Sequence, residues 1–128
     1  MERIRVLIVD DSAAVRDGLR SILSAFPDIE LVGESADGLD AVDKAESLAP
    51  HVVLMDEEVP VIGSAEATRW IKEESPDVRV LFLTVHADNL EAAMAAGADD
   101  YLPKDSDRQT LVRTIRELGA ARRSGDEA

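Results

Sequence analysis

Four apolar residues in succession, Val52 to Met55, end on a carboxylate at Asp56. Two of the four are β-branched, and an uninterrupted apolar run this short is typical of a strand buried on both faces. Such strands belong to parallel sheets covered by helices, and open sheets of that class bind ligands beyond the carboxyl ends of their strands. Asp56 therefore has two interpretations: a cap of the strand or of the turn after it, or a member of a functional site.

The rest of the chain alternates between strand-like and helix-like patterns. Apolar runs predict strands over residues 3–9, 29–33, 51–56, 78–84 and 99–102. Apolar residues at helical spacing predict helices within residues 12–26, 41–48, 64–75, 88–96 and 107–118. Ser12, Ser64 and Asp107 are placed to cap helices, Gly97 suits a helix end, and Asp37-Gly38 predicts a turn.

Strict alternation predicts an α/β fold: a doubly wound, five-stranded parallel sheet with five helices on both of its faces. Pattern alone does not fix the strand order, but the common order for five strands is 2-1-3-4-5. The 128 residues suit one domain. We assign residues 1–121 to that domain and residues 122–128 to a flexible C-terminal tail or the start of a linker.

Composition excludes several classes of site. The chain has no cysteine, and so neither a disulfide framework nor a thiolate metal site. A net charge of −13 argues against direct binding of nucleic acid by this domain. No signal peptide and no apolar run of membrane-spanning length is present, so we expect a cytoplasmic protein without a membrane partner.

Polar residues follow four of the predicted strands: Asp10-Asp11, Asp56, Thr84 and Lys104. Each has an ordinary interpretation as a cap, a strand residue or a surface charge. Together they belong on one edge of the sheet, where three neighbouring carboxylates need a cation. Mg²⁺ is the natural choice because it takes oxygen ligands, and a lysine and a hydroxyl beside it suit a phosphoryl group.

The chain resembles the receiver domain of two-component response regulators, with its flavodoxin-like fold, over residues 3 to about 118. The motifs that carry the resemblance are Val-Asp-Asp at 9–11, Leu-Met-Asp at 54–56, Pro60, Leu-Thr at 83–84, Ala-Gly-Ala-Asp-Asp-Tyr-Leu at 96–102, and Lys104.

The resemblance implies a role for each motif residue. Asp56 is expected to be the phosphoacceptor, with Thr84 donating a hydrogen bond to the phosphoryl group and Lys104 pairing with it. The expected ligands of Mg²⁺ are the side chains of Asp10, Asp11 and Asp56 and the backbone carbonyl of Glu58. Tyr101 matches the aromatic residue that changes rotamer as the threonine moves.

The implied function is a phosphorylation-activated signalling switch rather than an enzyme, although such a domain assists its own phosphorylation and dephosphorylation. Its expected partners are a sensor histidine kinase or histidine phosphotransfer protein and an output protein or fused effector domain, with a homodimer possible on phosphorylation. Two alternatives stay open: a pseudo-receiver that serves only as a protein-interaction module, and an aspartyl-nucleophile phosphatase.

The chain departs from the family pattern near the proposed acceptor. In the family an apolar residue normally follows the acceptor and a methionine precedes the proline, whereas this chain has Glu57-Glu58-Val59 before Pro60. Val61-Ile62-Gly63-Ser64 stands where a Gly-x-Asp-Gly-like turn is common. Val85 stands where a small residue is frequent, and the span from Thr84 to Gly97 is short. Glu58 and His86 occupy positions that tune phosphoryl lifetime in this family.

Overall fold

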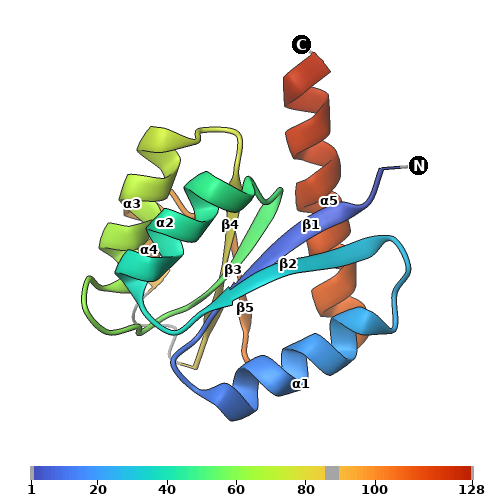
Figure 1. The fold of residues 1–128 in the computed structure, drawn as a ribbon, viewed down its shortest axis with the longest axis horizontal. Helices are drawn as coiled ribbons and strands as arrows, with labels where there is room; N and C mark the ends of the chain where they lie inside the picture. The colour runs from blue at the N-terminus through green and yellow to red at the C-terminus, as the bar shows by residue number, and fades with distance from the viewer. Residues whose placement is uncertain (1, 86–89, 128) are drawn as a thin grey trace.

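The computed structural model describes residues 2–85 and 90–127. Strands and helices alternate: β1 (Ile4–Val9), α1 (Ala13–Ser24), β2 (Ile29–Ser35), α2 (Gly38–Leu48), β3 (Val52–Asp56), α3 (Ser64–Glu74), β4 (Arg79–Thr84), α4 (Leu90–Ala95), β5 (Asp100–Pro103) and α5 (Arg108–Glu127). The strands form one parallel sheet in the order β2-β1-β3-β4-β5 (Figure 1). The predicted fold class and strand order are confirmed.

The helices cover both faces of the sheet, with α2, α3 and α4 on one side and α1 and α5 on the other (Figure 1). Within β3, Val53 and Met55 pack in the first of these layers, while Val52 and Leu54 pack in the second. All five residues of β3 are buried, because successive side chains of a central strand point into opposite apolar layers. This two-sided burial makes β3 a rigid support for Asp56 at its end.

Most of the predicted helix signals are confirmed, and two are wrong. Ser12 caps α1 by accepting a hydrogen bond from the Val15 amide at 3.2 Å. Ser64 is not the N-cap of α3: Gly63 occupies that position, and the Ser64 hydroxyl instead donates to the Asp56 carbonyl at 2.6 Å. Asp37 and Gly38 do not form a free turn, because Asp37 caps α2 and Gly38 is the first residue of that helix.

The loop between β3 and α3 is tied to the start of α2. The Gly38 amide donates to the Pro60 carbonyl at 3.1 Å. A Cβ atom on Gly38 would lie 2.1 Å from the Ile62 carbonyl oxygen, so this close approach requires glycine. Within the loop Val61 has a φ of 76°, an uncommon and strained conformation for a β-branched residue.

The C-terminal third agrees in part with the predictions. Gly97 follows α4 with a φ of 108°, as expected for a glycine beyond a helix end. The predicted start of that helix at Asp88 and Asn89, and His86, lie outside the described residues. Helix α5 continues to Glu127. The assignment of residues 122–128 to a flexible tail or the start of a linker stays a prediction. None of the described helices has both the length and the apolar character needed to cross a membrane.

Substitution of Gly38 tests the contact between the two loops. We expect Gly38→Ala to lower the free energy of unfolding by about 1–3 kcal/mol, because the added methyl group overlaps the Ile62 backbone. The control is Gly18→Ala within α1, where nothing lies within 4 Å of the added Cβ. That substitution should instead raise stability by about 0.5–1 kcal/mol. Urea unfolding of both variants provides the measurement, and equal effects would contradict the proposed overlap.

Candidate functional site

Three carboxylates meet at the carboxyl edge of the sheet. Asp10 and Asp11 follow β1, Asp56 ends β3, and one oxygen from each lies within 4.8 Å of the others. Asp10 and Asp56 are buried, with 2% and 6% of their surface exposed, whereas Asp11 is exposed. The three acids therefore lie together at the carboxyl edge of the sheet, as their positions at the ends of the predicted strands indicated.

Local hydrogen bonds orient Asp10. Its amide donates to the Ser35 carbonyl of β2 at 3.0 Å, and its Oδ1 accepts from the Ser12 amide at 2.9 Å. The Arg16 guanidinium donates to the Asp10 carbonyl at 2.7 Å. The start of α1 therefore holds both the backbone and the side chain of this acid.

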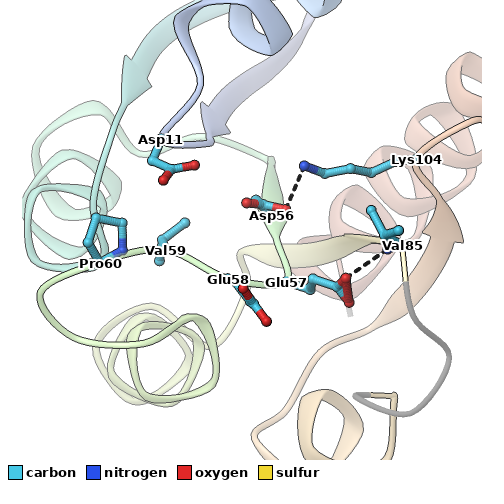
Figure 2. Close-up of a pocket in the computed structure, with 8 residues that line it drawn as sticks. All are labelled: Asp11, Asp56, Glu57, Glu58, Val59, Pro60, Val85 and Lys104. Carbon is cyan, nitrogen blue, oxygen red and sulfur yellow. Dashed lines mark hydrogen bonds and ion pairs between the residues drawn. The ribbon is translucent and has the colours of Figure 1, made fainter.

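Lys104 follows β5 (Asp100–Pro103), and its side chain extends to Asp56 (Figure 2). Its Nζ lies 2.8 Å from Asp56 Oδ1 and 3.1 Å from Asp10 Oδ2. Its amide donates to the Thr84 carbonyl at 2.9 Å, which ties the segment after β5 to the end of β4. The ammonium is thus shared between Asp10, which follows β1, and Asp56, the last residue of β3.

The balance of burial and charge favours a cation at this edge. Burial raises the pKa of Asp56, the hydrogen bond from Lys104 opposes that shift, and the charges of Asp10 and Asp11 add to it. Burial disfavours the charged form of Lys104, but its hydrogen bonds with Asp56 and Asp10 outweigh this effect and raise its pKa. The lysine is therefore charged, and Asp56 ionises less readily than a solvated carboxyl.

Thr84 ends β4 as predicted, but its hydroxyl points to a partner that the sequence did not indicate. Thr84 Oγ1 donates to Glu57 Oε2 at 2.6 Å, and the Val85 amide donates to Glu57 Oε1 at 2.8 Å. The Glu57 amide in turn donates to the Leu83 carbonyl at 3.1 Å. The sequence indicated this arrangement only in that Glu57 is an acid at a position where an apolar residue is usual in the family.

Two adjoining hollows share Glu57. The larger contains the acids and Lys104 (Figure 2), and its described lining residues are Asp11, Asp56, Glu57, Glu58, Val59, Pro60, Val85 and Lys104. The smaller is an apolar recess lined by Glu57, Phe82, Thr84, Leu90, Ala93 and Tyr101. Thr84 and Tyr101 thus border the second hollow together, and Tyr101 is 41% exposed. Glu58 is exposed and lines the first hollow, and its role as a backbone ligand stays a prediction.

Sequence reasoning also missed Ser64. By donating to the Asp56 carbonyl, its hydroxyl fixes the backbone at the point where β3 becomes the loop. A serine next to a predicted helix start is ordinarily interpreted as a cap, so its sequence position did not reveal this role.

Comparisons with known proteins agree with this geometry. The sequence profile of the response regulator receiver domain matches residues 6–116. The response regulator UvrY of Escherichia coli (strain K12) is 44% identical over 122 residues, which cover 94% of this chain and 56% of UvrY. The chain thus spans about half the length of the curated relatives that it matches.

Solved structures show the same architecture. The response regulator domain of Thermotoga maritima CheB has a TM-score of 0.86 and 33% identity, over 93% of this chain and 98% of that one. The receiver domain of a sensor histidine kinase from Pseudomonas aeruginosa PAO1, whose crystal structure has a magnesium ion coordinated in the active site cleft, has a TM-score of 0.85 and 28% identity, over 92% and 98%. With the profile match and the fold in agreement, this chain belongs to the response regulator receiver domain family.

Proposed function

We propose that the chain is a phosphorylation-dependent signalling switch in which Asp56 accepts a phosphoryl group. The observation that supports this most directly is the pairing of Asp56 with Lys104 Nζ at 2.8 Å, beside Asp10 and Asp11. A carboxylate on a rigid strand end, next to an ammonium and facing an open hollow, is a suitable phosphoryl acceptor.

The donor set suits Mg²⁺. Asp10, Asp11 and Asp56 offer hard carboxylate oxygens within 4.8 Å of one another, and the Glu58 carbonyl is the further ligand that we assign. An ion held there would neutralise negative charge on the phosphoryl oxygens. The pKa of Asp56 is raised first by burial and then by the charges of Asp10 and Asp11, and a bound cation would favour its ionised form against both effects.

The transfer itself uses groups of this chain. An oxygen of Asp56 bonds to phosphorus while the bond from phosphorus to the donor nitrogen of a phosphohistidine breaks, and the electron pair of that bond stays on the imidazole. Lys104, charged and in contact with Asp56, pairs with the negative charge that arrives. The product is an acyl phosphate on Asp56.

The response passes from Thr84 to Tyr101. Thr84 follows the phosphoryl group, and Tyr101, which borders the same apolar recess, changes its rotamer and alters the surface of α4, β5 and α5. The donor is a sensor histidine kinase or histidine phosphotransfer protein. The signal passes on to a separate output protein or to a fused effector domain. Phosphorylation favours a homodimer.

The complete set of acids and the Lys104 pairing give the pseudo-receiver alternative no support. We therefore keep one proposed function, which depends on the chemistry of Asp56.

Removal of the acceptor tests the proposal directly. Asp56→Asn should abolish Mg²⁺-dependent uptake of phosphate from acetyl phosphate, because an amide oxygen is a poor nucleophile for phosphorus. The control Asp43→Asn removes an exposed acid from α2 and should leave uptake unchanged. Intact-mass spectrometry measures the added phosphate, and uptake that persists in Asp56→Asn would show that another residue is the acceptor.

Metal addition and removal test the acid cluster. Mg²⁺ should raise the thermal midpoint of the protein, since a ligand that binds only the folded state adds about 1.4 kcal/mol at ten times its dissociation constant. EDTA should reverse the shift, and Asp11→Asn should reduce it strongly because one ligand is lost. Scanning calorimetry provides the measurement, and an equal Mg²⁺ shift in Asp11→Asn would contradict the assigned ligands.

The raised pKa of Asp56 predicts a cost in stability. From the ordinary value of 3.8 up to the raised value, the folded protein binds more protons than the unfolded chain. Stability therefore falls as pH rises through that window and stays lower above it. In metal-free buffer, Asp56→Asn should be more stable than the wild type at pH 7, and this gain should vanish as the pH falls below the unfolded pKa. Urea unfolding across pH measures it; a stability loss at pH 7 would contradict the sign.

A further inference from the structure

Glu57 holds two consecutive donors at the end of β4 with one carboxylate. Thr84 Oγ1 lies 2.6 Å from Oε2, and the Val85 nitrogen lies 2.8 Å from Oε1. The Glu57 backbone is anchored beside β4 by its own bond to Leu83. Figure 2 shows the side chain of Glu57 directed at Val85. The contact is therefore bidentate and starts from a fixed backbone.

A hydroxyl and an amide that converge on two oxygens of one anion form an oxyanion-binding pair. Here the anion is supplied by the chain itself. Val85 and Glu57 line the same hollow as Asp56 and Lys104, so the Val85 residue borders the space that an anion on Asp56 would enter. Thr84, the residue before Val85, lines the adjoining recess that shares Glu57 with this hollow. The donors and the acceptor are thus parts of one site.

A phosphoryl group on Asp56 and the Glu57 carboxylate cannot use this pair together. Both are anions, they would stand on neighbouring residues, and each donor hydrogen serves one acceptor well. Either the carboxylate holds Thr84 and Val85, or it leaves them to the incoming group.

We propose that Glu57 is an internal gate of the phosphorylation site: its carboxylate occupies the Thr84–Val85 donor pair and must be displaced before Thr84 can bind the phosphoryl group. This inference rests on the proposed function and adds its regulation. The gate holds Thr84 in the unphosphorylated arrangement, at the recess that it shares with Tyr101. It also lowers the affinity of the site for an external anion, because each binding event has to break two charge-assisted bonds.

The contact can be tested without any phosphoryl donor. In Glu57→Ala and in the closer match Glu57→Gln, the amide proton of Val85 should move upfield in NMR spectra of the full chain, because it loses a carboxylate partner. Glu66→Gln, which alters an exposed acid on α3, should leave it in place. A Val85 amide that does not respond to either Glu57 variant overturns the gate, whatever the acceptor proves to be.

The gating is tested by titration with beryllofluoride in the presence of Mg²⁺. Glu57→Ala should bind it roughly tenfold more tightly, the equivalent of about one charge-assisted hydrogen bond, and Glu57→Gln should lie between Glu57→Ala and the wild type. Glu66→Gln should bind like the wild type. With Mg²⁺ at a saturating concentration for both proteins, equal or weaker binding by Glu57→Ala overturns the gate.

The double variant Glu57→Ala/Asp56→Asn separates this inference from the proposed function. Tighter binding in Glu57→Ala that disappears in the double variant supports both. Equal binding by wild type and Glu57→Ala that requires Asp56 overturns the gate alone. Tighter binding that survives in the double variant supports the gate and overturns the assignment of Asp56 as acceptor.

Discussion

The ammonium of Lys104 lies between the carboxylates of Asp56 and Asp10, and the arrangement of the whole edge depends on this contact. Two acids with 6% and 2% of their surface exposed would be costly side by side without a positive partner. The lysine also connects strands that are far apart in sequence, since it follows β5 while Asp10 follows β1 and Asp56 ends β3. One ammonium does not neutralise the charges of Asp10, Asp56 and the nearby Asp11. The remaining negative charge at this edge favours a divalent cation.

The fold was predictable because its signals are redundant. Each strand of the central pair, β1 and β3, is an apolar run that only two-sided burial explains, and strict alternation with helices leaves a parallel sheet as the simple solution. Local details were less predictable where one residue type serves two purposes. Serine is a residue type that commonly caps helices, yet the Ser64 hydroxyl donates to the Asp56 carbonyl instead. Gly38 looks like a turn residue, yet it is needed for the close approach of Ile62.

The acids and Lys104 were predictable from position alone, since the carboxyl ends of parallel strands share one edge. The direction of the Thr84 hydroxyl was not predictable, because it depends on the rotamer of a neighbouring side chain and not on the spacing of apolar residues in the sequence. A threonine at a strand end rotates towards the strongest acceptor within reach. Glu57 offers one, on a backbone held by its own bond to Leu83. Sequence pattern indicated that Glu57 is unusual, but the geometry was needed to identify its partners.

The surplus of acid at this edge has two opposed consequences. It favours the proposed binding of a cation, yet it repels the phosphoryl group that Asp56 is proposed to accept. With Glu57 bound to Thr84 and Val85, one of these negative charges is directed towards donors and away from the acceptor. The same bonds remove those donors from use until the carboxylate moves. In a receiver of this kind the Glu57 carboxylate stabilises the unphosphorylated arrangement. The same carboxylate has to be displaced before that arrangement can change.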